Sequence, residues 1–444
     1  MSKIQVNPTR QALLKAFKTL KLLGFTLRDY QVKGVHWMIS NELKSPLKGG
    51  ILADDPGLGK TVQTAALMVG IIKKTLIIVP KPVLSQWIII MEKVFPGEVY
   101  IHYGREKVKS REELRAKNFM VCITTHGSCM AREKNIFETL VHLPGFWERL
   151  IIDEGHVIRN HKTKMYKTMM NFIKLTESRW LLTGTPVQNK RLDIINLLSF
   201  IGMGTKVLNS QLEFYISKYL LRRTKLETLI RGNGILEEYT TITKINNFKT
   251  IEEQTAYDEI ESFSMMQLAD CKYGGGSIID FQIMLLETMF RLRQATSSPQ
   301  IAIESMRKKY GDDIIKNDFE GISSKIREVT NDIMCAEGLS LVFCHFHREM
   351  ELIQNLLGKK NVESRIYSGK LSVKERDNVL KEYINPDMGV TVLIIQIMAG
   401  GVGLNLQNFS NVFILSPDWN PCNEIQAIAR AHRYGQKKKV TVTK

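Results

Sequence analysis

The sequence predicts an α/β protein with two parallel sheets in tandem, because it contains two sets of strand-like apolar runs and one glycine-rich loop. The runs are short, rich in β-branched residues and separated by helix-like or polar sequence. They are residues 75–80, 118–125, 149–154 and 179–186 in the first set, and 339–346, 363–367, 389–396 and 411–417 in the second. Continuous rather than alternating apolarity is typical of strands that are buried on both faces, as in parallel sheets.

The glycine-rich loop lies in residues 50–61, which read in the order strand, loop, helix. Glycines let backbone N–H groups surround an anion, and the following helix directs its positive dipole end to the same place. Lys60 would reach the outer phosphates of a nucleotide, and the Thr61 hydroxyl would hold a magnesium ion. Asp54 stands where the usual motif has its first glycine, so a plain turn between a strand and a helix is the alternative.

Composition bounds the class of protein. A length of 444 residues suggests two or three domains. Lysine and arginine number 62 against 45 acidic residues, and the resulting charge of +17 favours a polyanionic partner such as nucleic acid over a merely basic protein. The six cysteines form no Cys-x-x-Cys pair, which disfavours a zinc finger, and no apolar run approaches the ~18 residues that span a bilayer. We therefore expect no membrane partner.

Two further strand ends carry polar groups. Asp153 and Glu154 end a buried strand, where adjacent carboxylates are costly unless they meet a cation or do chemistry. Asp153 would orient the magnesium ion and Glu154 the attacking water, although an acidic pair that caps the next helix is the alternative. Residues 182–189 end the next strand in hydroxyls and amides, among them Gln188, which could sense a γ-phosphate. Read alone, this segment is an ordinary turn.

Upstream and downstream segments add candidates. Gln31 falls off the apolar face of residues 27–38 and could read an adenine edge, or it is a surface residue. The first 28 residues lack acids but read as a first helix rather than a transit peptide. Residues 190–320 are helical in pattern and contain the basic cluster 219–225, which could face phosphates or be a solvated helix end. We place a domain junction near residues 232–234.

The second set of strands lacks a phosphate loop, so a nucleotide held between the two units needs positive charge from the second. Gln426, Arg430 and Arg433 are about a turn apart, which predicts that they share one helical face. Two arginines there can clamp a γ-phosphate as charge develops. The glycine-rich residues 399–406 could approach a phosphate backbone or nucleotide closely, although a mobile turn is the commoner meaning of such a run.

Taken in order from Leu27 to Val442, these segments resemble helicase superfamily two and, within it, the Swi/Snf family of double-stranded-DNA translocases. The phosphate loop resembles motif I, residues 153–156 the Asp-Glu-Ala-His box, and residues 426–436 motif VI. Further similar segments are 27–38, 76–87 (motif Ia), 124–127, 182–189, 221–225, 292–294 with Pro299, 323–326 and 399–406 (motif V). The resemblance implies two RecA-like lobes with an ATP cleft between them and helical protrusions. The implied division is lobe 1 in 1–228, a helical protrusion and linker in 229–320, and lobe 2 in 321–444.

The resemblance also implies residue roles. The catalytic set would be Lys60, Asp153, Glu154, Gln188, Arg430 and Arg433, the last two as arginine fingers. ATP would be bound by Gln31, Asp54, Gly57, Leu58, Gly59, Lys60, Thr61, Gly403, Gln426, Arg430 and Arg433. Mg²⁺ would be held by Thr61 and Asp153. Phosphates of one DNA strand would meet Thr124, Thr125, His126, Arg222, Arg223, Ser368, Gly369, Gly400, Gly401 and Asn405.

The implied function is a DNA-dependent ATPase that moves along duplex DNA and remodels protein–DNA complexes, nucleosomes among the candidates. We expect a monomer in the nucleus, or in a viral factory or host cytoplasm if a virus encodes it. An RNA or DNA strand-separating helicase of superfamily two and a catalytically inactive DNA-binding scaffold are the alternatives. Three features depart from the family pattern: Asp55-Pro56 replaces Glu-Met, Gly155 replaces alanine, and the chain stops soon after Gln436, as in a truncated form or a compact viral one.

Overall fold

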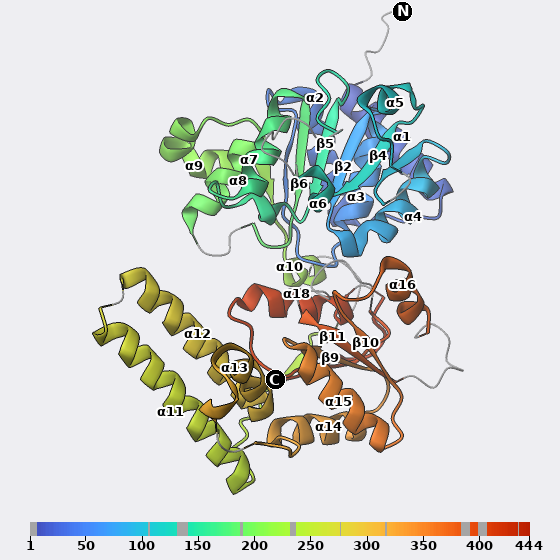
Figure 1. Cartoon of the computed structure of the whole chain (residues 1–444). Helices are drawn as coiled ribbons and strands as arrows, with labels where there is room; N and C mark the ends of the chain where they lie inside the picture. The colour runs from blue at the N-terminus through green and yellow to red at the C-terminus, as the bar shows by residue number, and fades with distance from the viewer. Residues whose placement is uncertain are drawn as a thin grey trace, which may run out of the picture. The chain divides into compact units, whose positions relative to one another are not determined.

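The computed structural model describes residues 7–444 except 105–106, 131–140, 187–189, 231–236, 276, 316–317, 383–390, 398–405 and 434. The chain divides into two compact units, and the boundary along the sequence falls between residues 236 and 237 (Figure 1). Each unit is built on its own parallel sheet, so the predicted α/β class with two tandem parallel sheets is confirmed.

Unit 1 contains a seven-stranded parallel sheet in the order β3-β4-β2-β5-β6-β1-β7. Its strands are β1 (Gly50–Leu52), β2 (Thr75–Val79), β3 (Val99–His102), β4 (Val121–Thr125), β5 (Arg149–Asp153), β6 (Ser178–Leu182) and β7 (Leu220–Leu221). The four predicted runs and the strand before the glycine-rich loop all lie in it. β3 and β7 were not predicted, and β7 comes from the segment that was read as a basic helix end.

Helices cover both faces of this sheet (Figure 1). The described helices of unit 1 are α1 (Pro8–Leu22), α2 (Asp29–Lys44), α3 (Lys60–Gly70), α4 (Leu84–Val94), α5 (Arg111–Ala116), α6 (His126–Cys129), α7 (Lys164–Met170), α8 (Arg191–Phe200), α9 (Thr205–Tyr219) and α10 (Lys225–Ile230). Successive strand residues alternate between two cores: Ile152 packs in the core with α7 and α8, whereas Ile151 packs in the core with α1 to α4. The first helix predicted from the opening residues is confirmed as α1.

Unit 2 contains a six-stranded parallel sheet in the order β10-β11-β9-β12-β13-β8. Its strands are β8 (Thr240–Ile242), β9 (Ser340–Cys344), β10 (Ser364–Tyr367), β11 (Val392–Gln396), β12 (Asn411–Ile414) and β13 (Thr441–Thr443). The four predicted runs are confirmed, and β8 and β13 are additional. The sheet is packed with α14 (Ser324–Cys335), α15 (His347–Lys359), α16 (Val373–Glu382) and α18 (Pro421–Ala431).

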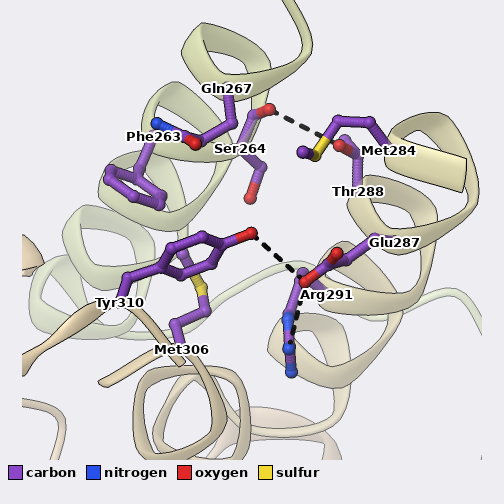
Figure 2. Close-up of a pocket in the computed structure, with 9 residues that line it drawn as sticks. All are labelled: Phe263, Ser264, Gln267, Met284, Glu287, Thr288, Arg291, Met306 and Tyr310. Atoms are coloured by element: carbon purple, nitrogen blue, oxygen red, sulfur yellow. Dashed lines mark hydrogen bonds and ion pairs between the residues drawn. The ribbon is translucent and has the colours of Figure 1, made fainter. Parts of the chain in front are cut away.

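The helical region of unit 2 is a hairpin of α11 (Ile251–Tyr273) and α12 (Ile278–Ser297), followed by α13 (Pro299–Tyr310) (Figure 1). Ile260, Ala295 and Ile303 form its small apolar core. A small pocket lies between the three helices, and polar contacts cross it (Figure 2). The Tyr310 hydroxyl donates to Glu287 at 3.3 Å, and Glu287 also pairs with Arg291 at 3.3 Å. The Tyr310 contact fastens α13 to the middle of α12, whereas the Glu287–Arg291 pair lies within α12.

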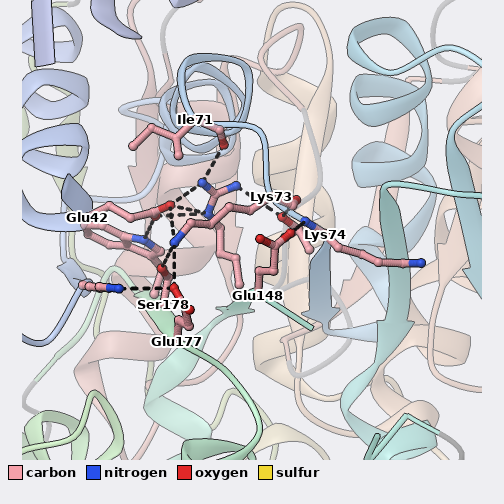
Figure 3. Close-up of polar contacts among 11 residues, drawn as sticks. Glu42, Ile71, Lys73, Lys74, Glu148, Glu177 and Ser178 are labelled. Atoms are coloured by element: carbon pink, nitrogen blue, oxygen red, sulfur yellow. Dashed lines mark hydrogen bonds and ion pairs between the residues drawn. The ribbon is translucent and has the colours of Figure 1, made fainter. Parts of the chain in front are cut away.

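A buried ion pair lies at the edge of sheet 1 where β2, β5 and β6 begin (Figure 3). Arg149 of β5 and Glu42 of α2 are both fully buried, and the Arg149 Nε donates to the two carboxylate oxygens at 3.1 and 3.0 Å. The Trp180 indole N–H donates to the same carboxylate at 2.8 Å, and Lys73 lies 3.7 Å from it. The ion pair joins α2 to β5, and its further contacts come from β6 and from the segment before β2. Together these contacts fasten α2 to the sheet.

Candidate functional site

The glycine-rich loop connects β1 to α3, as the sequence predicts. Gly57 and Gly59 have φ angles of 94° and 77°, in the left-handed region that side chains other than glycine rarely adopt. A β-carbon on Gly59 would also collide with the amide nitrogen of Gln31. The loop therefore needs both glycines in order to turn into α3, whose first residue is Lys60. The alternative of a plain turn does not account for the side chains that gather around it.

Gln31 lies against this loop and not on the surface. It is 8% exposed, and its amide nitrogen donates to the Leu58 carbonyl at 3.1 Å. Its amide oxygen accepts from the Arg28 N–H at 2.9 Å, and the Tyr30 hydroxyl donates to the same Leu58 carbonyl at 3.2 Å. The surface alternative for Gln31 is thus wrong, whereas its contact with adenine stays a prediction.

Asp153 and Glu154 end β5 beside this loop. The Asp153 carboxylate accepts from the Trp87 indole N–H at 2.7 Å and from the Glu154 backbone N–H at 2.9 Å. Burial, and after it the neighbouring Glu154 charge, raise the pKa of Asp153 to about 6, although the Trp87 hydrogen bond and the Lys60 charge oppose the rise. A buried carboxylate whose charge is disfavoured in this way gains from a cation, which fits the predicted magnesium ligand.

The backbone of Glu154 has a φ of 50°, a left-handed conformation that is costly for a residue other than glycine. The His156 Nδ1 lies 3.2 Å from the Glu154 carboxylate and 3.2 Å from the Thr183 hydroxyl, which follows β6. The Lys60 ammonium donates to the Asp54 carbonyl at 2.7 Å. The ends of β1, β5 and β6 thus bring a lysine, two carboxylates and a hydroxyl to one edge of the sheet.

Two aromatic side chains, Trp87 and His126, contact Asp153, and neither contact was predicted from the sequence. Trp87 belongs to α4, and its indole binds the carboxylate as described above. The His126 Nε2 lies 2.9 Å from the Asp153 carbonyl oxygen, and burial lowers the pKa of His126 to about 4. His126 was expected to meet DNA. Trp87 and Asp153 are far apart in the sequence, and no sequence pattern indicates that an indole in one helix will contact a carboxylate at the end of a distant strand. Only the resemblance of residues 76–87 to motif Ia pointed to Trp87.

The other predicted DNA contacts of unit 1 have partners inside the unit. The Thr124 hydroxyl is buried and donates to the His102 carbonyl at 2.9 Å, and the Thr125 hydroxyl accepts from the Ser128 N–H and caps α6. Arg223 pairs with the buried carboxylate of Asp54. Arg222 is 45% exposed, and its guanidinium lies 3.8 Å from the Asp55 carboxylate. Of these four side chains, Arg222 is the one with substantial exposure for a phosphate.

The predicted residues of unit 2 lie at its strand and helix ends. Ser368 and Gly369 follow β10, and Arg376 donates to the Gly369 carbonyl at 2.9 Å. Gln426 and Arg430 lie in α18, but this helix ends at Ala431, so the expected single helical face does not include Arg433. Arg433 lies in the turn after α18, and in that turn the His432 ring contacts the Glu237 carbonyl at 2.8 Å. Burial lowers the pKa of the Arg433 guanidinium.

Five predicted residues lie outside the described part of the chain: Gln188, Gly400, Gly401, Gly403 and Asn405. Two departures from the family pattern lie inside it. Pro56 packs against Gly184, where an added β-carbon would come within 2.7 Å of the proline ring. At Gly155 a β-carbon would lie 3.1 Å from Leu181, so the alanine of the family pattern would need a small shift of that side chain.

Comparisons with known proteins identify two domains in the chain. Residues 30–214 match the model of the SNF2-related domain, and residues 325–435 match that of the helicase conserved C-terminal domain. ATP-dependent helicase brm of Drosophila melanogaster is 28% identical over 95% of this chain and 28% of its own length. The Probable global transactivator of Orgyia pseudotsugata multicapsid polyhedrosis virus is 28% identical over 94% of this chain and 86% of its own.

Nuclear protein STH1/NPS1 of Saccharomyces cerevisiae is 27% identical over 95% of this chain, which spans 33% of that protein. The chain thus covers about a third of the length of these eukaryotic relatives. A solved structure of the Sulfolobus solfataricus SWI2/SNF2 ATPase core in complex with dsDNA is 25% identical, with coverage of 94% of this chain and 87% of that one and a TM-score of 0.43. The two domain matches and these relatives show that the chain belongs to the Swi/Snf family of ATPases.

Proposed function

We propose that this chain is a DNA-dependent ATPase that translocates on double-stranded DNA and remodels protein–DNA complexes. The observation that carries the proposal is the meeting of Lys60, Asp153 and Glu154 just beyond the carboxyl ends of β1 and β5, the two strands that flank β6 in unit 1. A phosphate loop, a buried carboxylate and a second carboxylate with a strained backbone are the parts that nucleotide hydrolysis needs.

Each residue has a role in this proposal. The N–H groups of Gly57 to Lys60 and the Lys60 ammonium bind the phosphates of ATP. Glu154 orients the attacking water and accepts its proton. Thr61 and Asp153 hold Mg²⁺, which when bound would neutralise phosphate charge. Arg430 and Arg433 of the helicase C-terminal domain meet the charge that develops on the transferred phosphoryl group.

Duplex DNA is the proposed partner of both units. The net charge of +17 and the exposed Arg222 support contacts to phosphates, which carry no base code and weaken with salt. We propose nucleosomes or other DNA-bound proteins as the remodelled complexes, since the brm helicase and the viral transactivator cover nearly all of this chain. The corresponding sites of action are the nucleus or a viral factory. Among the described residues, no helix is long and apolar enough to cross a membrane.

We expect duplex DNA to raise the ATPase rate about tenfold or more, and RNA of equal length to raise it far less, because the phosphate contacts close the catalytic site. Steady-state ATPase assays over a salt series measure this, and a triplex-displacement assay reports movement without strand separation. A rate that RNA or single-stranded DNA stimulates best would favour a strand-separating helicase. DNA binding with no turnover would favour the inactive scaffold.

Trp87→Phe should raise the Mg²⁺ concentration for half-maximal ATPase activity by about tenfold, because the Asp153 carboxylate loses a charge-assisted hydrogen bond that orients it. The apolar contacts of the ring stay, so the variant should fold and bind duplex DNA normally. A Mg²⁺ titration of the ATPase rate at fixed ATP measures the change. The same titration of Trp147→Phe, whose indole donates to the Val141 carbonyl, is the control. Identical Mg²⁺ curves for wild type and Trp87→Phe would show that Trp87 does not orient Asp153 for Mg²⁺ binding.

A further inference from the structure

Arg223 joins four elements beneath the phosphate loop. Its Nε donates to one oxygen of Asp54 at 2.8 Å, and its Nη2 donates to the other. The same Nη2 donates to the Gln63 amide oxygen at 2.8 Å, and Nη1 donates to the Tyr30 carbonyl. Asp54 leads from β1 into the loop, Gln63 belongs to α3, and Tyr30 belongs to α2. One guanidinium thus links α2, α3 and the start of the loop.

The Asp54 carboxylate depends on this contact. Its side chain is fully buried, and the Gln63 Nε2 also donates to it, at 3.0 Å. A buried carboxylate that loses a cationic partner costs several kcal/mol unless it moves or takes up a proton. Since Asp54 comes only three residues before Gly57, any such movement would displace the loop itself.

The helix that faces this pair is shaped for it. Gly34 of α2 has no side chain, and a β-carbon there would collide with the Gln63 amide oxygen and lie 2.7 Å from the Arg223 Nη2. The Arg223 guanidinium also lies over the Tyr30 ring, at 5.3 Å. The glycine of α2 therefore leaves the space that the arginine and glutamine occupy.

Arg223 belongs to the segment through which the chain leaves unit 1. β7 pairs with β1 in parallel, and the pairing continues past both strands. The Ala53 N–H donates to the Leu221 carbonyl at 2.7 Å, and the Asp55 N–H donates to the Arg223 carbonyl at 3.0 Å. The Lys225 N–H donates back to the Asp55 carboxylate at 3.1 Å. Residues 220–225, which we call the exit segment, thus run alongside the start of the loop and lead through α10 toward unit 2.

We propose that Arg223 is a positioning residue through which the exit segment sets the nucleotide-binding conformation of the phosphate loop. This inference rests on the proposed ATP-binding function and replaces the expected DNA contact of Arg223. Because coupling between two events is reciprocal, nucleotide in the loop stabilises the exit segment, and a displaced exit segment weakens nucleotide binding. The exit segment is then a route by which the connection between the units regulates ATP binding.

The test measures nucleotide affinity without DNA. Arg223→Ala should raise the Kd for a fluorescent ATP analogue about ten- to a hundredfold, since a charge-assisted contact to a buried group is lost. Arg223→Lys should not restore it, because one ammonium cannot contact Asp54, Gln63 and Tyr30 together. Duplex DNA affinity should stay within about twofold of wild type. Arg10→Ala, the same change at an exposed arginine of α1, should leave the nucleotide Kd unchanged.

A second variant covers the case in which Arg223→Ala does not fold. Gly34→Ala changes no charge and favours the helix, but its β-carbon separates Gln63 from Arg223. It should therefore weaken nucleotide binding as well. Hydrogen exchange adds a readout that a purely structural role would not change: nucleotide should slow exchange in residues 220–225 of wild type and of Arg10→Ala, but not of Gly34→Ala.

The outcomes separate this inference from the proposed function. Folded Arg223 and Gly34 variants with wild-type nucleotide affinity would overturn the positioning role while leaving the ATPase proposal intact. If Arg223→Ala lost duplex DNA affinity but kept its nucleotide affinity, Arg223 would be assigned to DNA binding, as first expected, and the positioning role would be overturned. Wild-type protein that binds no nucleotide would overturn both.

Discussion

Glu154→Gln is expected to lower the ATPase rate at saturating duplex DNA by about a thousandfold, while ATP binding stays near that of wild type. The amide keeps the size of the carboxylate but cannot accept a proton from the attacking water. The left-handed backbone of Glu154 and the His156 Nδ1 at 3.2 Å already fix where this side chain lies. The loss should therefore fall on kcat, because the loop at Lys60, which we propose binds the phosphates, is unchanged.

Steady-state turnover and equilibrium binding of ATP, measured on the same sample, test this prediction. Glu148→Gln is the matched control, since Glu148 precedes the other end of β5 and accepts from the Lys74 N–H at 2.7 Å. The control should retain full turnover. A Glu154→Gln protein that hydrolyses ATP as fast as wild type would exclude Glu154 as the general base, and a loss confined to KM would assign it to binding.

The sequence predicted the parts of this site that depend on local pattern. Long buried strands are continuous apolar runs, so β2, β5 and β9 were predicted. A glycine-rich loop between a strand and a helix is typical of phosphate binding, so the loop at Lys60 was predicted as well. β7 and β13 were missed because each is two or three residues long and is defined only by a distant partner strand. Arg433 lies beyond α18, next to His432, whose ring contacts the Glu237 carbonyl nearly two hundred residues away, and helical spacing in the sequence gives no sign of that contact.

Arg223 shows a different limit. A cationic cluster has the same composition whether it meets phosphates or a buried carboxylate, so charge alone left residues 219–225 as a phosphate contact or a solvated helix end, and neither reading pointed to a buried acid. Asp54 was identified as the residue that replaces a glycine in the loop motif and, from the resemblance, as an ATP contact. Its pairing with Arg223 spans 169 positions of the chain, and sequence spacing gives no sign of it. The Arg223 side chain is largely buried and the Arg222 side chain is exposed. This difference depends on the pairing of β7 with β1, which the sequence did not predict.

Arg149→Met should destabilise unit 1 by about 3–5 kcal/mol, because it leaves the Glu42 charge buried without its cation. Methionine fills most of the space of the arginine stem, so the loss comes from the uncompensated carboxylate and not from a large cavity. Denaturant unfolding followed by tryptophan fluorescence measures it, since the Trp180 indole donates to the same carboxylate. The two units can unfold separately, so the transition that involves Trp180 is the one to compare. Arg348→Met, at an exposed pair with Glu351 in unit 2, should cost less than about 1 kcal/mol.

The double variant Arg149→Met with Glu42→Leu decides what the pair contributes. If the cost of the single change is the unpaired charge, removing both charges should recover most of the lost free energy of unfolding, even though two more apolar side chains now lie where an ion pair was. The Trp180 indole and the Lys73 ammonium would lose a partner, so recovery should be incomplete. A double variant as unstable as Arg149→Met would show that the arginine contacts to the Ile71 carbonyl and the Thr75 hydroxyl, and not its charge on Glu42, hold the ends of β2 and β5 together.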